Sequence, residues 1–258
     1  MSDTNIEWAD KVWNPVTGCD KVSAGCANCY AETFANRGMG EWGDRLFRDV
    51  KMHVKRLDMP RHWKKPRKIF VNSMGDMFHE KVLYQFWYGV VDVMTDCPQH
   101  TFLILTKRPE RMVEFVNQQS APSNCWLGTS VEGPDYLYRL DLLRKVKHPN
   151  RFVSFEPLLD DLGTVDLHGI GWAICGGESG YGARKYHLRW GQGLYYQCRA
   201  AKVPFFMKQV GANAYDSPMD PESGVMVPDR YETLDPKGGD PMEWPEDLRV
   251  REFPEVKA

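Results

Sequence analysis

Short hydrophobic runs alternate along this chain with longer segments whose apolar residues recur at helical spacing. The β-branched and aromatic runs predict strands at residues 68–72, 101–105, 126–130, 151–154, 172–175 and 204–207, and a weaker first strand near 12–16. The segments between them predict helices at residues 29–36, 82–95, 109–118, 135–146 and 188–201. Strands joined by helical crossovers form parallel sheets. We therefore expect an α/β fold, a parallel (β/α) barrel or partial barrel. An open doubly wound sheet is less favoured, because no GxGxxG motif follows the first strand.

Polar residues cluster directly after the predicted strands. In a barrel the carboxyl ends of the strands share one rim, where active sites are built. The rim candidates are Asn72, Ser73 and Asp76; Thr106, Lys107 and Arg108; Thr129, Ser130 and Glu132; Ser154 and Glu156; Gly176, Gly177 and Glu178; and Lys208 and Gln209. We expect these residues to converge on one pocket. Structural roles stay open: Asp76 as a helix cap, for example, or Glu156 as the ion-pair partner of Arg108 or Lys208.

Three of the seven cysteines, Cys19, Cys26 and Cys29, lie within eleven residues that follow the predicted first strand. The odd cysteine count, in a chain whose polar N-terminus does not resemble a signal peptide, argues against a disulfide framework. Gly18 and Gly25 each precede a cysteine and permit the tight turns that aim several sulfurs at one point. The other four cysteines lie singly among apolar neighbours, as buried free thiols usually do.

Three thiolates on one short loop can share a metal centre. Zinc accepts a CxxC pair, but a structural zinc site takes four protein ligands, and no fourth Cys or His lies at finger-like spacing. A [4Fe–4S] cluster suits three cysteines better, because three irons take one thiolate each and the fourth stays open for a substrate or cofactor. Zinc and three unligated thiols remain the alternatives.

Charge divides the chain into two parts. The net charge is −2, but residues 212–258 hold 5 basic and 12 acidic residues and 7 of the 17 prolines. We expect a barrel over residues 1–211 and an acidic, proline-rich extension over 212–258 that packs on or near it.

No run approaches the roughly 20 apolar residues that a membrane span requires. The expectation is a cytoplasmic protein without membrane contact.

The cysteine loop and the strand ends together resemble a known family. A three-cysteine loop after the first strand of a parallel barrel, ending Cys-x-x-Cys-Tyr, is similar to the radical SAM enzymes. The stretches WNPVTGC, GCANCYAE, FVNSMGDMFHE, LTKRPERM, WLGTSVE, RFVSFEPLL, GGESG and PFFMKQVG resemble, in this order, a phage and bacterial three-cysteine-motif family, a domain of unknown function among the radical SAM barrels. The resemblance spans about residues 5–211. The spacing departs from the common CxxxCxxC, because six residues separate Cys19 from Cys26.

The resemblance implies a [4Fe–4S] cluster on Cys19, Cys26 and Cys29, with S-adenosylmethionine (SAM) on the open iron. An electron from a donor such as flavodoxin or ferredoxin cleaves SAM to a 5′-deoxyadenosyl radical, which abstracts hydrogen from the substrate. By position, the cofactor-binding candidates are Tyr30, Asn72, Ser73, Asp76, Ser130, Glu132, Gly176, Gly177 and Glu178. The candidates for the substrate end, as charge clamps or proton donors, are Lys107, Arg108, Glu156, Lys208 and Gln209. The resemblance also implies the cytosol of a bacterium or of a phage-infected host.

A basic segment indicates the substrate class. Residues 51–68 hold eight Lys or Arg and one Trp, a composition that can track a phosphate backbone and stack a base. The candidates for contact with DNA or RNA are Arg61, Trp63, Lys64, Lys65 and Arg67. The hypothesis is a radical SAM enzyme, a lyase or a base-modifying enzyme, that acts on a nucleobase in modification or lesion repair. Two alternatives stay open: the basic segment is an ordinary solvent-exposed surface, and the substrate is a peptide or a small metabolite. So does a non-catalytic nucleic-acid-binding protein whose three-cysteine loop holds a structural zinc.

Overall fold

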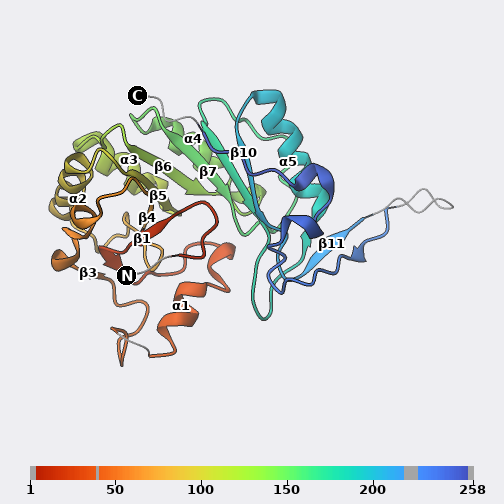
Figure 1. Ribbon diagram of the computed structural model, residues 1–258, viewed down its shortest axis with the longest axis horizontal. Helices are drawn as coiled ribbons and strands as arrows, with labels where there is room; N and C mark the ends of the chain where they lie inside the picture. Colours follow the sequence, from red (N-terminus) through yellow and green to blue (C-terminus); the bar gives the residue numbers. More distant parts are fainter. Residues whose placement is uncertain (1–3, 39–40, 218–225, 255–258) are drawn as a thin grey trace. The chain divides into compact units, whose positions relative to one another are not determined.

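Seven parallel strands form the central sheet of the computed structural model, which describes residues 4–38, 41–217 and 226–254. The strand order is β1-β4-β5-β6-β7-β8-β10 (Figure 1). Their bounds are Lys11–Trp13 (β1), Lys68–Val71 (β4), Thr101–Thr106 (β5), Cys125–Ser130 (β6), Arg151–Phe155 (β7), Trp172–Gly176 (β8) and Phe205–Gln209 (β10). In this order β1 and β10 are the end strands and not neighbours, so the sheet is a partial barrel. The predicted α/β fold with a parallel partial barrel is confirmed.

The chain divides into two compact units by its internal contacts. The first unit comprises Met1–Thr129 and Arg139–Phe152, and the second comprises Ser130–Tyr138 and Val153–Glu255. In the first unit β1 pairs with β4, β4 with β5 and β5 with β6, all in parallel. In the second unit β8 and β10 are parallel neighbours. The expected domain boundary at residue 211 stays a prediction.

The helices follow the strands as the crossover pattern predicts. They are α2 (Tyr84–Asp96), α3 (Pro109–Gln118), α4 (Tyr138–Lys145) and α5 (Leu188–Ala201). In the first unit α2 buries one face, which includes Trp87, Val90 and Met94 at helical spacing. The predicted helix over 135–146 is shorter than expected, because the chain first forms a separate 3₁₀ turn at Pro134–Tyr136.

The predicted first strand divides into two short strands around Pro15. After β1, a second strand, β2 (Val16–Thr17), leaves the main sheet and pairs antiparallel with β3 (Lys51–Met52). Proline has no N–H to donate, so it interrupts the ladder at this point. Between β2 and β3 the chain makes one long excursion, which carries the three cysteines and α1 (Tyr30–Ala35). Figure 1 shows α1 apart from α2 and α3.

The excursion has a small core of its own. Ala31 and Ala35 of α1 pack with Trp42 and Phe47, and Cys19, Cys29 and Met74 lie against this cluster. The Arg45 guanidinium stacks 3.9 Å from the Trp42 ring and donates to Thr17 Oγ1 at 2.7 Å. The cysteine loop is therefore fixed by packing as well as by its backbone.

Additional short strands and a C-terminal segment complete the second unit. A three-stranded sheet, β12-β11-β9, combines β9 (Tyr186–His187), β11 (Ala214–Asp216) and β12 (Asp229–Arg230). Residues 250–252 run along β10: the Met207 amide donates to the Val250 carbonyl at 2.8 Å, and the Glu252 amide to the Phe205 carbonyl at 2.9 Å. This segment covers a strand edge that would otherwise present unpaired peptide groups. The sequence pattern did not predict these pairings.

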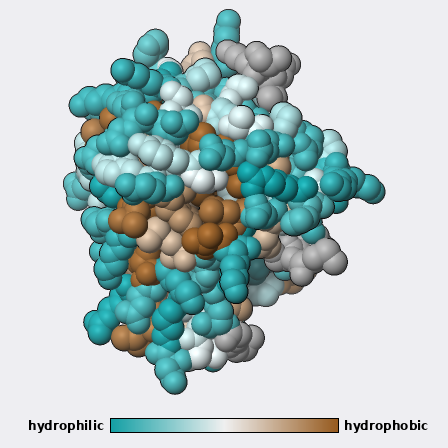
Figure 2. Space-filling view, turned by 90° about the vertical axis from the view of Figure 1, so that its left-hand side faces the viewer, coloured by the Kyte–Doolittle hydropathy of each residue, from teal (hydrophilic) through white to brown (hydrophobic). Residues whose placement is uncertain are grey.

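The described helices include none with the length and apolarity to cross a membrane. The face shown in Figure 2 is mostly hydrophilic and has one hydrophobic patch near its centre. Exposed hydrophobic side chains of the first unit include Val54, Met59 and Leu83.

Two glycines of α5 provide a matched test of the packing in the second unit. A Cβ at Gly191 would lie 2.1 Å from the hydroxyl of the buried Tyr186, whereas a Cβ at Gly193 would meet nothing within 4 Å. We expect Gly191→Ala to lower the free energy of unfolding by about 1–3 kcal/mol through overpacking. Gly193→Ala should raise it by up to about 1 kcal/mol through helix propensity. Urea unfolding followed by circular dichroism measures both changes. Equal stability of the two variants would contradict the packing at Tyr186.

Candidate functional site

The cysteine loop lies directly against the loop that follows β4. The Gly18 amide donates to the Met74 carbonyl at 2.8 Å, and Gly18 and Gly75 form an isolated parallel bridge. Gly18 has φ +93°, and a Cβ there would lie 2.8 Å from the Phe47 carbonyl oxygen. A Cβ at Gly75 would lie 3.0 Å from the Gly18 carbonyl oxygen. Only glycines permit this approach, which sets Cys19 beside the end of β4.

The three cysteine side chains influence one another electrostatically. Burial, with smaller contributions from Asp76 and Cys26, raises the pKa of Cys19 to about 12, and Arg108 opposes this rise. Burial also raises the pKa of Cys29, with Cys26 adding to the effect, while amides at the start of α1 and Lys107 oppose it. Cys26 thus contributes to the raised pKa of both other thiols. Metal ligation would require the loss of the thiol protons, and the neighbouring cations favour that loss.

Arg108, at the end of β5, connects the cysteine loop to the loop after β4. Its side chain is 5% exposed, and Nη1 donates to Cys19 Sγ and to Asp76 Oδ2, both at 3.3 Å. Nη2 donates to the Asp20 carbonyl, and Nε to Glu80 Oε1, also at 3.3 Å. Burial lowers the pKa of Arg108, but Asp76, Cys19 and Glu80 together outweigh it and hold the pKa above its usual value. The guanidinium therefore stays charged beside the sulfur.

Asp76 is a buried acceptor whose two oxygens both have protein donors. Thr106 Oγ1 lies 2.7 and 2.9 Å from the two oxygens, and the Phe78 amide donates to Oδ1 at 2.9 Å. Together with the Arg108 contact, these bonds occupy the carboxylate. The structure thus gives Asp76 a positioning role, the kind of structural role that the sequence left open for it.

A histidine and two carboxylates lie next to Arg108. His79 is fully buried, and its Nδ1 accepts from the Lys81 amide at 3.1 Å. Nε2 therefore carries the proton of the neutral ring and donates to Asp20 Oδ2 at 3.0 Å. Asp20, His79 and Glu80 have ligand atoms that all lie within 4.8 Å of one another. The sequence analysis did not select these residues, although His79 and Glu80 end the FVNSMGDMFHE stretch and Asp20 follows Cys19.

Asn72 and Ser73 lie at the carboxyl end of β4, close to the cysteine loop. Asn72 is 3% exposed with φ +64°, and its Oδ1 accepts from the Val16 amide at 3.0 Å. Its amide nitrogen Nδ2 is buried and has no partner in the described part of the chain. The Ser73 carbonyl accepts from the Tyr30 hydroxyl at 2.5 Å, which ties α1 to this loop. A buried, unpartnered donor beside three cysteines is a feature that a bound acceptor would satisfy.

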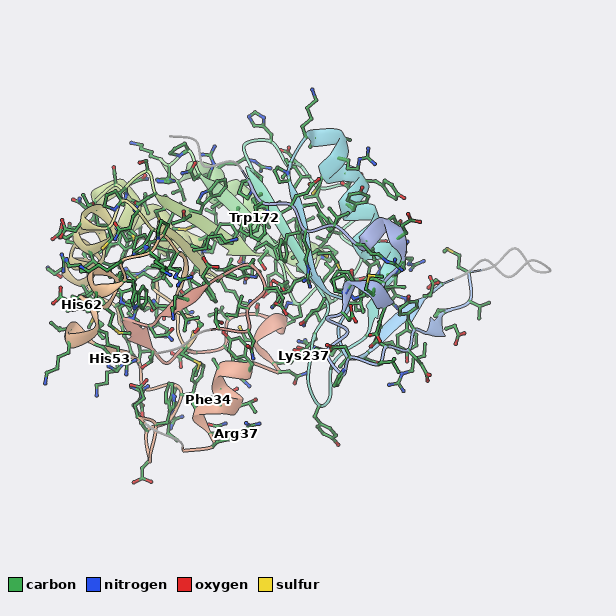
Figure 3. All side chains as sticks on the ribbon, viewed as in Figure 1. Phe34, Arg37, His53, His62, Trp172 and Lys237 are labelled. Atoms are coloured by element: carbon green, nitrogen blue, oxygen red, sulfur yellow. The ribbon has the colours of Figure 1, made fainter. Side chains whose placement is uncertain are left out.

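The outer side of α1 remains exposed. Tyr30 and Phe34 are 60% and 42% exposed. Figure 3 labels Phe34 on this helix and Arg37 just beyond its end. The helix that begins after Cys29 therefore presents aromatic side chains to solvent.

The second unit holds the remaining rim candidates. Glu156 Oε1 lies 3.0 Å from Lys208 Nζ, and its Oε2 accepts from Ser154 Oγ at 2.9 Å. A register shift between Met207 and Gln209 sets Lys208 apart from the regular ladder. The structure thus brings Glu156 and Lys208 together as an ion pair, which the sequence analysis gave as the structural alternative for Glu156.

Glycines and amides line the end of β8. A Cβ at Gly176 would lie 2.8 Å from Glu156 Oε1, and one at Gly177 would lie 2.3 Å from the Val210 carbonyl oxygen. Gln209 Nε2 donates to the Gly177 carbonyl at 2.9 Å. Glu178 is 6% exposed and accepts from Arg184. Ser130 and Glu132 are buried at the end of β6.

The basic segment before β4 lies at the other end of that strand from Asn72. Lys64 and Lys65 are exposed, and Arg67 and Trp63 are partly buried. Arg61 forms ion pairs with Asp58 and with Asp96, the latter at 2.5 Å. The Trp63 ring packs edge-on against His100, with centroids 6.2 Å apart. The five nucleic-acid candidates are thus close in sequence and held by local contacts, but they do not lie at the strand end that carries the cysteines.

Comparisons with known proteins give a family and a fold neighbour. A family model described as "Protein of unknown function (DUF5131)" matches residues 3–237. No curated protein matches the chain. Among solved structures, the fold of this chain is similar to the fold of a spore photoproduct lyase mutant, with a TM-score of 0.48 and 10% sequence identity. The match covers 88% of this chain and 70% of the lyase chain.

The two carboxylates that contact Arg108 differ in burial and provide a matched pair of variants. Asp76 is 5% exposed, whereas the Glu80 side chain is 67% exposed. We expect Asp76→Asn to lower the free energy of unfolding by roughly 3–5 kcal/mol, because it leaves a buried guanidinium without its main counter-charge. Glu80→Gln should cost less than about 1 kcal/mol, because water screens that pair. Urea unfolding of both variants measures the difference, and equal losses would contradict the buried pair.

Proposed function

We propose that this chain, which belongs to the DUF5131 family of proteins of unknown function, is a radical SAM enzyme that acts on a nucleobase in DNA or RNA. The observation that carries the proposal is the cysteine loop held against the loop after β4, with Arg108 Nη1 at 3.3 Å from Cys19 Sγ. Cys26 acts on the pKa of both Cys19 and Cys29, and Arg108 and Lys107 oppose the rise of those values. The pKa of Lys21 is raised, first by its hydrogen bond to Glu32 and in part by Cys29 and Cys26.

The donor set fits a [4Fe–4S] cluster. Three thiolates leave one iron open, and the cations Arg108, Lys107 and Lys21 offset the negative charge that thiolate ligation concentrates there. Cys19, Cys26 and Cys29 would hold the cluster. When bound, the cluster and SAM supply a 5′-deoxyadenosyl radical for hydrogen abstraction, with the electron from a flavodoxin or ferredoxin.

The residues after β4 fit the polar end of SAM. The buried Asn72 Nδ2 has no acceptor among the residues that the structure describes, so a carboxylate of the cofactor would satisfy it. Ser73 and Tyr30 border the same loop. The Asp76 carboxylate accepts from Arg108, so we assign it to positioning that guanidinium and not to direct contact with the cofactor.

The second unit, taken by itself, has further candidates for ligand contact at the ends of its strands. Ser130, Glu132, Gly176, Gly177 and Glu178 are proposed for the ribose and adenine side. A side chain at Gly176 or Gly177 would collide with Glu156 or the Val210 carbonyl, so packing requires glycine at both positions. As charge clamps or proton donors toward a substrate we propose Lys107 and Arg108 of the first unit. In the second unit, taken by itself, the candidates for the same roles are Glu156, Lys208 and Gln209. The ion pair holds the two side chains 3.0 Å apart, and a substrate group would replace one partner to bind the other.

A non-catalytic nucleic-acid-binding protein with a structural zinc on the cysteine loop is the second candidate function. It rests on the same three thiols, because zinc also binds Cys thiolates. Asp20 directly follows Cys19, and its carboxylate with His79 offers oxygen and nitrogen atoms of the kinds that zinc binds. The two candidates differ in metal content and in SAM cleavage.

Anaerobic preparation with iron and sulfide tests the cluster. We expect a brown protein whose visible absorbance bleaches on reduction and which, with SAM and reductant, forms 5′-deoxyadenosine. Cys26→Ala should abolish this product, because the loop loses one of three iron ligands. Cys97→Ala, which changes a buried cysteine at the end of α2, is the matched control and should retain it. Chromatographic assay of 5′-deoxyadenosine gives the result. A colourless protein with stoichiometric zinc would support the second candidate, and unchanged cleavage by Cys26→Ala would remove the loop from the mechanism.

The basic segment is tested by charge reversal. We expect Lys64→Glu, Lys65→Glu and Arg67→Glu together to weaken binding of an oligonucleotide and to reduce the slope of log K against log[salt] by about 2–3, because each phosphate contact adds roughly 0.7–0.9 to that slope. Arg61→Gln is the control and should have a smaller effect, since Asp58 and Asp96 already neutralise its guanidinium. Fluorescence anisotropy titrations at several salt concentrations measure both. If the affinity and the slope are unchanged, the segment does not contact nucleic acid.

A further inference from the structure

The loop between β8 and β9 presents a tyrosine that nothing in the described chain covers. Tyr181 has a relative exposure of 106%, the highest among the exposed large hydrophobic residues described. It lies between Gly180, with φ +93°, and Gly182, with φ +74°. A Cβ at either glycine would meet nothing within 4 Å, so the loop tip is open on all sides. A fully exposed ring makes little contribution to packing, and tyrosine is enriched at interfaces.

The base of this loop is firmly held. The buried Glu178 carboxylate accepts from the Arg184 amide at 2.9 Å, from its Nε at 3.0 Å and from its Nη2 at 2.5 Å. The Glu178 carbonyl accepts from the Ala212 amide at 2.9 Å, and the Ala183 carbonyl from Asn213 Nδ2 at 3.0 Å. These bonds close the loop on both sides of the tip. The base of the loop is thus fixed by hydrogen bonds, which reduces the conformational entropy that Tyr181 loses when it forms a contact.

Cations and aromatic rings follow the loop. Lys185 Nζ lies 4.6 Å from the centre of the Tyr215 ring, and the His187 ring packs 4.6 Å from Trp190. Burial lowers the pKa of His187, and the positive charges of Arg189 and Lys185 lower it further. The segment that follows the loop therefore carries two cations, Lys185 and Arg189, interleaved with aromatic side chains.

We propose that this loop is a contact for single-stranded nucleic acid, in which Tyr181 stacks on an unpaired base and Lys185 and Arg189 attract the neighbouring phosphates. The inference rests on the proposed function for its ligand class and adds a binding element outside residues 51–68. A base offers a flat face that a ring at a loop tip can cover, whatever the sequence, and the phosphates complement the adjacent cations. The loop follows β8 directly, at the carboxyl end of that strand, where binding sites of parallel sheets lie.

The stacking contact is tested with the full chain and fluorescein-labelled, single-stranded 12-mers of DNA and RNA of one sequence. We expect Tyr181→Ala to weaken binding by about 5- to 150-fold, the usual effect of removing one stacked ring. Tyr181→Phe should bind like the wild type, because the ring and not the hydroxyl makes the contact. Tyr138→Ala, which changes a 49% exposed tyrosine on α4, is the matched control and should leave affinity unchanged. The DNA and RNA arms show which of the two is preferred.

The electrostatic contact is separated from stacking by its salt dependence. Lys185→Ala should reduce the slope of log K against log[salt] by about 0.7, as expected for one phosphate contact on a single strand, while Tyr181→Ala leaves the slope unchanged. The proposal is overturned if the wild type binds neither 12-mer, if Tyr181→Ala binds as tightly as the wild type, or if Tyr181→Phe is as weak as Tyr181→Ala.

The same measurements distinguish this inference from the proposed catalytic function. The binding assay needs neither SAM nor reductant, so it measures the loop independently of the reaction. Tyr181-dependent binding without formation of 5′-deoxyadenosine would support the loop and remove the radical SAM function. Formation of 5′-deoxyadenosine with no dependence of binding on Tyr181 would retain the enzyme and remove the loop.

Discussion

Arg108 is the residue on which the candidate site of the first unit depends. Its guanidinium contacts the sulfur of Cys19, the carboxylate of Asp76 and the carbonyl of Asp20, and so connects the end of β5 with the cysteine loop and the loop after β4. A buried cation requires counter-charge, and Asp76 supplies it. Because Asp76 is itself held by Thr106, the position of the sulfur is tied to the strand β5. The loop geometry thus derives from the sheet.

Close backbone approach is the second constraint on the site. Gly18 and Gly75 allow two loops to meet at main-chain distance, and the β2–β3 ladder closes the base of the excursion that carries the cysteines. The Trp42 and Phe47 side chains fill the space below α1. Packing, backbone contact and the Arg108 network therefore act on the same few residues. A metal centre on this loop would have its ligands arranged before it binds.

The polar residues of the two units fall into groups with different tasks. The Asp76 carboxylate is occupied by protein donors, so it holds a loop in place. Asn72 keeps a buried donor without a partner, and Tyr181 keeps an exposed ring without a contact in the described chain. Groups of the second kind are the ones that a ligand would complete. Residue type and position at a strand end do not separate these groups, because the separation depends on the donors that surround each side chain.

The sequence alone determined the sheet, the helices and the grouping of the three cysteines, because hydrophobic periodicity and local spacing are properties of neighbouring residues. It determined the parallel fold from strands such as 101–105 and helices such as 109–118, which recur as β5 and α3. Only the tertiary structure decided that Asp76 serves Arg108, that Asp20 and His79 join the cysteine loop, and that residues 250–252 cover the edge of β10. These pairings join residues far apart in the chain, and their energies depend on burial and on distances that no local pattern encodes.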